Sequence, residues 1–211
     1  KDCLMSTEIR NKAGEIIDYT FNDVGSEKVV VIGHGVTGNK DRPLVLALAE
    51  GLAGAGISAL RFSFSGNGDS EGTFLDSNIT KELSDLTAVI DFVENLGKKV
   101  IYAGHSMGGA VGVSVASEDD RILGLVSLAG MVNTKKFAET EFGEVRPDEG
   151  LMWDDEDCPL SQSFMDDLVG IDTLLGKGEL IKVPWLLVHG TEDDVVLIDD
   201  TNEIYEKAGE Q

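Results

Sequence analysis

The sequence predicts an α/β fold in which a mostly parallel central sheet carries helices on both faces. Continuous β-branched runs such as KVVVIGHG (28–35) and KKVIYAG (98–104) are typical of strands that are buried on both faces. Segments with apolar residues at helical spacing separate these runs, and strands that alternate with helices favour a parallel sheet. Because the chain has 211 residues, of which 42% are hydrophobic, it suits a single domain over residues 1–211.

The expected elements follow in order along the chain. Strands are predicted at 4–10, 15–22, 28–35, 57–64, 98–104, 121–130 and 183–190, with a turn at NKAGE between the first two. Four helices are predicted. The first begins near Asp41 and Pro43, the second covers 78–96, the third is formed by SMGGAVGVSVAS (106–117), and the fourth begins at TNEIYEKAG (201–209). The helix over 78–96 shows the clearest apolar stripe, with Leu83, Leu86 and Ile90 on one side.

Residues 132–180 interrupt this alternation of strands and helices. Within them, residues 137–172 hold twelve acidic side chains, one basic side chain and the aromatic residues Phe137, Phe142, Trp153 and Phe164. Acidic residues alone would fit a solvated loop. The interleaved aromatic residues favour an inserted cap with an apolar underside, placed over the carboxyl ends of the strands, where open α/β sheets bind ligands.

Charge and cysteine content exclude several functions. The 39 acidic and 17 basic side chains leave a net charge of −22, which repels nucleic acid phosphates and anionic lipid. No apolar run is long enough to span a bilayer, and the first ten residues lack the apolar core of a secretion signal. Cys3 and Cys158 are far apart and are expected to be free thiols. The sequence therefore predicts a cytoplasmic protein without nucleic acid or membrane partners.

The segment GHSMGG (104–109) lies between an expected strand and an expected helix. This context is the one that a G-x-S-x-G nucleophile turn requires, with Ser106 on a strained turn and glycines at 104 and 108 leaving room for the backbone. The N–H of Met107 then lies at a helix N-terminus, where it can stabilise an oxyanion formed at Ser106.

The segment GHGVTGNKD (33–41) follows another buried strand. It is not a P-loop, because Asn39 occupies the position where the phosphate-binding motif needs lysine. The alternative is the loop that donates the second oxyanion N–H, which would come from Val36. The segment HGTEDDVV (189–196) ends a further strand and offers Glu192, Asp193 and Asp194 as acids that could orient a catalytic histidine. A solvated acidic turn would explain these three residues equally well.

Four segments together resemble the α/β-hydrolase superfamily, and in particular its small serine esterases of the feruloyl (cinnamoyl) type. They are HGVTGNK, RFSFSGNGDSEG, GHSMGG and HGTEDDVV, in family order over about 34–196. The resemblance implies an α/β-hydrolase fold with Ser106 as nucleophile and Asp193 as triad acid, because the family pattern is H-G-T-x-D-x-x-V. It also implies that Val36 and Met107 donate to the oxyanion, and that the cap over 132–180 sets acyl specificity.

The expected general base is the one departure from this family. The chain order in this fold is serine, acid and then histidine, and no histidine follows Asp193. Of the three histidines present, His105 directly precedes Ser106, and the family uses His34 and His189 structurally. The sequence therefore predicts a catalytic histidine beyond Gln211, after a further strand, with the last strand and histidine loop absent from residues 1–211.

The leading hypothesis is a serine carboxylic-ester hydrolase that acts through an acyl-enzyme on neutral esters with apolar or aromatic acyl groups. It needs no metal and no organic cofactor, its partner is a small-molecule ester, and the sequence is compatible with a homodimer. Two alternatives stay open. One is a serine aminopeptidase or thioesterase on the same fold, and the other is a non-catalytic binding protein that lacks the base.

Overall fold

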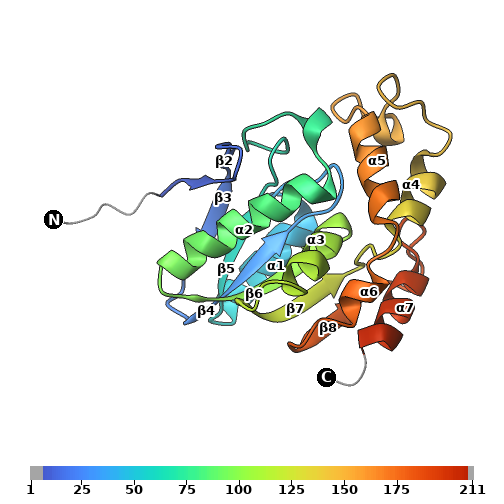
Figure 1. Cartoon of the computed structure of the whole chain (residues 1–211). Helices are drawn as coiled ribbons and strands as arrows, with labels where there is room; N and C mark the ends of the chain where they lie inside the picture. Colours follow the sequence, from blue (N-terminus) through green and yellow to red (C-terminus); the bar gives the residue numbers. More distant parts are fainter. Residues whose placement is uncertain (1–6, 209–211) are drawn as a thin grey trace.

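The computed structural model describes residues 7–208, and Figure 1 shows them as one sheet flanked by helices. Six strands pair in the order β3-β5-β4-β6-β7-β8, all parallel to their neighbours except β3, which runs antiparallel to β5. The strands of this sheet are β3 (Tyr19–Asn22), β4 (Lys28–Gly33), β5 (Ser58–Phe62), β6 (Lys99–His105), β7 (Ile122–Leu128) and β8 (Trp185–Val188). The α/β-hydrolase fold with a mostly parallel central sheet is confirmed.

Helices cover both faces of this sheet. Helix α1 packs on one face through Val45 and Ala49, which contact Val30 and Ile32 of β4. Helices α2 and α3 pack on the other face and on each other. The helices between the strands are α1 (Pro43–Gly54), α2 (Ile79–Asn95) and α3 (Met107–Ala116), with the short helix η1 (Phe74–Asp76) before α2 and helix α7 (Ile198–Ala208) after β8.

The N-terminal strands differ from the sequence prediction. Instead of one strand over 15–22, the chain forms β2 (Ile16–Ile17) and β3, and β2 pairs with β1 (Ile9–Arg10) in a separate two-stranded sheet. The strand breaks at Asp18, because its N–H bonds to the Ser70 hydroxyl at 2.8 Å and its carbonyl accepts from Ser63 N at 2.9 Å. Residues 4–6 of the first predicted strand, and Cys3, lie outside the described residues.

The cap segment, residues 132–180, stands between β7 and β8. It contains α4 (Thr134–Phe142), the short helix η2 (Met152–Asp154), α5 (Gln162–Ile171) and α6 (Leu175–Gly178). Figure 1 shows α4 and α5 side by side at one end of the molecule. Phe137, Phe142 and Phe164 are buried between them, with Phe142 at 6.0 Å from each of the other two rings.

Trp153 departs from the apolar underside that the sequence predicts. Its ring packs 4.9 Å from Phe142, yet the residue is 43% exposed and its indole N–H donates to Glu141 at 2.8 Å. Its φ of 48° puts the backbone in the left-handed region. Three of the four aromatic residues therefore belong to the buried part of the cap, and Trp153 does not.

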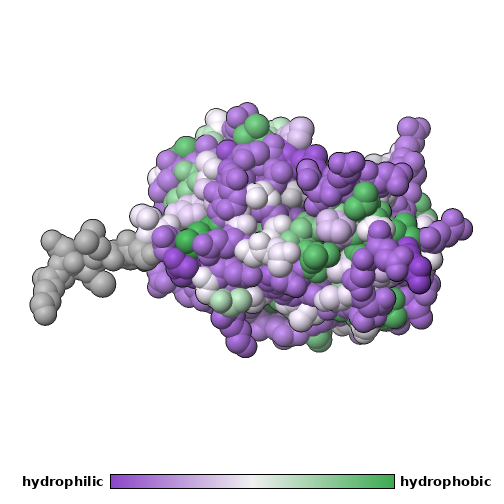
Figure 2. Space-filling view, turned by 90° about the horizontal axis from the view of Figure 1, so that it is seen from above, coloured by the Kyte–Doolittle hydropathy of each residue, from purple (hydrophilic) through white to green (hydrophobic). Residues whose placement is uncertain are grey.

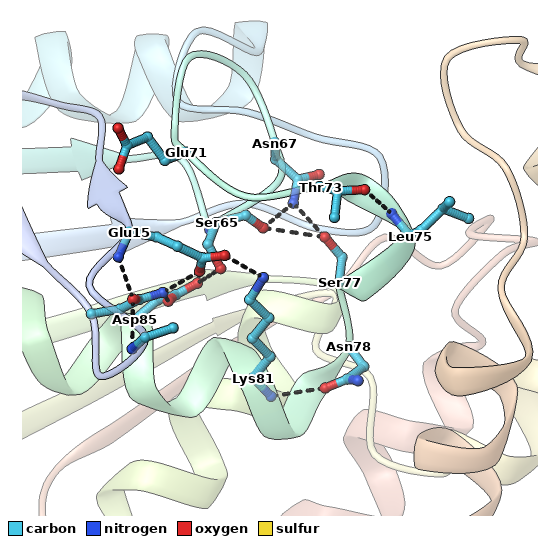
Figure 3. Close-up of polar contacts among 12 residues, drawn as sticks. Glu15, Ser65, Asn67, Glu71, Thr73, Leu75, Ser77, Asn78, Lys81 and Asp85 are labelled. Carbon is cyan, nitrogen blue, oxygen red and sulfur yellow. Dashed lines mark hydrogen bonds and ion pairs between the residues drawn. The ribbon is translucent and has the colours of Figure 1, made fainter.

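The long loop between β5 and α2 is anchored by a buried polar network, shown in Figure 3. The Asp85 carboxylate accepts from the Ser65 N–H, the Ser65 hydroxyl and the Asn11 amide, each at 2.8 Å. Lys81 bonds to Glu15 at 3.1 Å beside it. Because these contacts join the start of the chain to α2, the loop leaves β5 in a defined direction.

The surface agrees with the net charge of −22. Figure 2 shows one face on which hydrophilic residues dominate and the hydrophobic areas are small and separated. Within residues 7–208, no helix has both the length and the apolar character needed to cross a bilayer. Cys158 is a free, buried thiol, and burial raises its pKa to about 11.

Candidate active site

Ser106 occupies the turn between β6 and α3. Its φ of 50° and ψ of −116° are strained for a residue with a side chain, as expected of a nucleophile turn. The backbone is held on both sides, because Ser106 N donates to Leu128 O at 3.0 Å and Ser106 O accepts from Gly109 N at 2.9 Å. The hydroxyl makes no hydrogen bond within residues 7–208, so it is available to a substrate.

The two glycines around Ser106 let the strand and the helix approach closely. A Cβ at Gly104 would lie 2.2 Å from Gly108 O, and a Cβ at Gly108 would lie 2.4 Å from His34 O. The Tyr102 hydroxyl donates to Gly108 O at 2.9 Å and fixes the first turn of α3 from below. Side chains at positions 104 and 108 would therefore displace the turn.

The two predicted oxyanion donors lie on segments that meet at Ser106. Met107 is the first residue of α3, so its N–H has no acceptor within the helix. Val36 follows β4, and its N–H donates to no other described residue. A Cβ on Gly35 would lie 2.9 Å from the Ser106 Cβ, which shows how closely this loop passes the serine.

Asp193 lies in the turn after β8 and differs from its acidic neighbours. Its Oδ1 accepts from Val195 N at 3.1 Å and Val196 N at 3.0 Å, which fixes the orientation of the carboxylate. Glu192 and Asp194 are exposed and make no side-chain hydrogen bond within the described residues. Of the three acids, only Asp193 is held in one orientation by the backbone.

His34 and His189 both use their two ring nitrogens in hydrogen bonds. His34 Nδ1 lies 2.8 Å from Gly35 O and therefore carries the proton, while Nε2 accepts from Phe64 N at 3.0 Å. Burial lowers the pKa of His34 to about 4, so the ring is neutral. His189 also engages both ring nitrogens but in the opposite tautomer, because Nε2 donates to Val196 O at 2.7 Å and Nδ1 accepts from the Thr201 hydroxyl at 2.7 Å.

His105 is the histidine beside the nucleophile. Its ring lies against the loop after β4, because a Cβ on Gly35 would lie 3.1 Å from His105 Nδ1. Burial lowers the pKa of the imidazole, and the negative charge of Asp193 acts in the opposite direction.

The sequence did not single out Asn133 and Asp200, two residues near the serine. Met131 N donates to Ser106 O at 3.0 Å, and the following Val132 N and Asn133 N donate to the buried carboxylate of Asp200. In the sequence, Asp200 is one of several acids at the start of a helix, and Asn133 lies in a loop. No local pattern marks either residue, because 67 positions separate them.

A narrow cleft of about 50 Å³ lies between the cap and the acid-bearing turn. Its walls are α4 with Asn133 on one side, and Asp200 with the turn 194–197 on the other. A wider surface groove of about 360 Å³ lies between β1 and α2, and none of the predicted site residues lines it. None of the predicted site residues lines the narrow cleft either, although Asp194 and Val195 in its wall directly follow Asp193.

Comparisons with known proteins identify the family of this chain. A family model described as "Serine aminopeptidase, S33" matches residues 25–147, more than half of the chain. The uncharacterized protein YfhR of Salmonella typhi is 26% identical over 192 residues, which cover 86% of this chain and 59% of that protein. The chain thus spans less than two thirds of the length of this relative.

Two solved structures are similar over nearly the whole chain. Est1E from Butyrivibrio proteoclasticus, solved with ferulic acid bound, is 26% identical with a TM-score of 0.83, and the match covers 96% of this chain and 85% of that one. The esterase Pf2001 of Pyrococcus furiosus is 25% identical with a TM-score of 0.75, over 95% of this chain and 75% of that one.

Proposed function

The chain belongs to the serine aminopeptidase (S33) family of α/β-hydrolases, and we propose that it hydrolyses neutral carboxylic esters through an acyl-enzyme on Ser106. The observation that carries the proposal is the strained backbone of Ser106, with φ 50° and ψ −116° between β6 and α3. A serine in this turn presents its hydroxyl above the sheet, where a substrate carbonyl can approach it.

The reaction follows from the groups around this serine. Ser106 Oγ attacks the ester carbonyl carbon, and the carbonyl oxygen becomes an oxyanion that accepts from the N–H groups of Val36 and Met107. Each such donor contributes about 3 kcal/mol to stabilising the transition state. The alcohol leaves with the proton that Ser106 released, and water then hydrolyses the acyl-enzyme by the same steps.

The proton transfer needs a base that Asp193 can orient. His34 and His189 support this role poorly, because both ring nitrogens of each are engaged in hydrogen bonds. His105 directly precedes Ser106 and its ring lies against Gly35, but within the described residues it makes no hydrogen bond to the Ser106 hydroxyl. We therefore assign the base to a histidine other than these three, held by the Asp193 carboxylate.

The assignment of the base is tested by comparing the 211-residue chain with the complete product of its gene. Losing the base alone costs about 10⁶-fold in kcat, so the 211 residues alone should be nearly inert toward esters. Ester turnover at the same rate by both proteins would place the base within residues 1–211. His105→Gln would then be the variant expected to abolish it.

Features of the cap segment support neutral esters with an apolar or aromatic acyl group as substrates. Twelve acidic residues over 137–172 repel anionic substrates, and the buried rings of Phe137 and Phe142 give the cap an apolar interior. Est1E, the similar structure from Butyrivibrio proteoclasticus, was solved with ferulic acid bound, and ferulic acid has an aromatic acyl group.

A serine aminopeptidase is the second candidate, and the description of the matching family favours it. Carboxylates on the cap could hold the ammonium group of a peptide N-terminus. Comparing a p-nitrophenyl ester with an aminoacyl p-nitroanilide separates the two activities. Ester hydrolysis should dominate by kcat/KM, and a preference for the anilide would favour the peptidase.

Replacing the nucleophile tests the central proposal. Ser106→Ala should leave the thermal midpoint close to that of the wild type and abolish both ester turnover and labelling by a fluorophosphonate. Ser127→Ala is a matched control, because Ser127 is buried on β7 and bonds to Trp185. Fluorophosphonate labelling of Ser106→Ala at the wild-type rate would contradict the assignment.

A further inference from the structure

Asp200 is a buried carboxylate in the first turn of α7, and it is 6% exposed. Its Oδ2 accepts from Val132 N at 2.7 Å and from Asn133 N at 3.0 Å, and its Oδ1 accepts from the Asn133 side-chain amide at 2.9 Å. Hydrogen bonds to a charged acceptor are among the stronger ones in proteins. Asp200 therefore holds the chain directly after β7 with three of them.

Asn133 extends this attachment to a second residue of α7 and to one further segment. Its amide nitrogen also donates to Glu203 Oε2 at 2.9 Å, one turn along α7. Its amide oxygen accepts from the Thr173 hydroxyl at 3.1 Å, in the loop between α5 and α6. The donors and acceptors of the Asp200–Asn133 pair are thus matched on every side, so neither residue can rotate without losing a bond.

The segment held by Asp200 also contacts the nucleophile. Met131 N donates to Ser106 O at 3.0 Å, and Ala129 N donates to Val188 O at the end of β8. Ala129 has a φ of 47°, which shows that the chain turns sharply here. Because Met131 and Val132 are consecutive, a shift at Asp200 is transmitted to the carbonyl of Ser106.

The start of α7 is bonded to the acid-bearing turn as well. The hydroxyl of Thr201, next to Asp200, donates to His189 Nδ1, and His189 Nε2 donates to Val196 O at 2.7 Å. The N–H of Val196 in turn donates to the Asp193 carboxylate at 3.0 Å. One helical turn is therefore connected to the proposed nucleophile on one side and to the proposed acid on the other.

We infer that Asp200 is a positioning residue that sets the separation of Ser106 and Asp193 in the proposed hydrolase. The inference rests on the proposed function, and it concerns a residue that touches neither the substrate nor the reacting atoms. Its loss should slow acylation without weakening substrate binding. A displacement of about 1 Å at a catalytic site can cost about 10²-fold in rate.

The test compares Asp200→Asn with Asp199→Asn in the complete gene product. Asp199 is exposed in the same helical turn and its side chain makes no hydrogen bond within the described residues, so its variant controls for the loss of a charge near the helix start. Asn at position 200 keeps the volume but turns one acceptor into a donor that faces another donor. We expect kcat for a p-nitrophenyl ester to fall about 10²-fold with unchanged KM, and Asp199→Asn to retain the wild-type kcat.

A polarity swap provides the rescue. The triple variant combines Asp200→Asn with Asn133→Asp and Glu203→Gln, so that every donor again faces an acceptor. Its kcat should therefore recover. If the lost charge of Asp200 were the cause of the lower kcat, the triple variant would not recover, because it does not restore that charge. If Asp200→Asn does not fold, Asn133→Ala decides the question, because it removes only the side-chain bonds and should still lower kcat at constant KM.

The outcomes separate the inference from the proposed function. A wild-type protein that is inert toward esters and anilides would overturn the proposed function, and the inference with it. An active wild type, with an Asp200→Asn variant of lower thermal midpoint but unchanged kcat, would overturn the inference alone and leave Asp200 with a purely structural role.

Discussion

Two buried carboxyl groups on α2, one turn apart, should respond in opposite ways to substitution. Glu82 is 1% exposed, and neither of its carboxyl oxygens has a hydrogen-bond partner among the described residues. Asp85 is fully buried but accepts three hydrogen bonds, from Asn11 and twice from Ser65 (Figure 3). Replacing Glu82 should therefore stabilise the fold, and replacing Asp85 should destabilise it.

The magnitude follows from the missing hydrogen bonds. A buried polar group without a partner costs about 1–3 kcal/mol of folding free energy. Glu82→Met keeps the length of the side chain and removes both oxygens, so the free energy of unfolding should rise by about this amount. For a chain of this size the thermal midpoint rises by about 2–4 °C per kcal/mol. Asp85→Asn keeps one acceptor oxygen but places an amide donor against at least one of the three donors, and should cost about 1–3 kcal/mol.

The pH dependence has a defined sign. Burial raises the pKa of Glu82 well above its ordinary value, the charges of Asp85 and Asp167 add to this effect, and Lys81 opposes it. The folded state thus retains a proton that the unfolded state releases near pH 4.5. The stability due to protonated Glu82 is fully present below that pH and is lost as the pH rises through the folded-state pKa. Glu82→Met should flatten this decline.

Thermal unfolding of the wild type, Glu82→Met and Asp85→Asn between about pH 5 and about pH 9 measures both effects. The burial of Asp85 also raises its pKa, so part of the decline should remain in Glu82→Met. A Glu82→Met variant that is less stable than the wild type at neutral pH would refute the reasoning, because it would mean that the carboxyl group has a partner. A decline with pH as steep as that of the wild type would refute it too.

Three further predictions concern the site and the surface. Asp193→Asn should lower kcat by about 10⁴-fold, while Glu192→Gln and Asp194→Asn should keep a kcat near that of the wild type. Equal, mild losses of kcat in all three variants would show that these acids form only a solvated turn. Gly35→Ala should slow fluorophosphonate labelling, because the added Cβ would lie 2.9 Å from the Ser106 Cβ, whereas Gly51→Ala, with no atom near its added Cβ, should not. Thermal midpoints should rise from low to molar NaCl, because salt screens a net charge of −22 over about 10 Å at 0.1 M, and a flat curve would contradict this.

Much of the fold could be predicted from local patterns. The buried runs became β4, β6 and β7 with ends that moved by one or two residues, and Pro43 opens α1 at its first position as predicted. The break at Asp18 could not be predicted, because its backbone groups bond to Ser63 and Ser70, more than forty residues away. A periodic pattern reports which face of a segment is buried, but not which distant group takes its hydrogen bonds.

The exposure of Trp153 has a similar explanation. The aromatic residues interleaved with the acidic ones predict a cap with an apolar underside, and the Trp153 ring does contact Phe142. The indole N–H needs an acceptor, however, and it bonds to Glu141 at the surface, which leaves Trp153 43% exposed. The apolar interior of the cap could therefore be predicted from the sequence, and the orientation of Trp153 could not.

The sequence by itself determined the turn at Ser106, because a strand, two glycines at fixed spacing and a small-residue helix are local features that lead to one backbone path. The orientation of Asp193 is local as well, because its carboxylate accepts from Val195 N and Val196 N, two and three residues further along the chain. Only the tertiary structure decided that His34 engages both ring nitrogens, because Phe64 lies 30 positions away. It alone brought Asp200 to the chain after β7, since a hydrogen bond across 68 positions depends on how helices and strands pack and leaves no periodic signal in the sequence.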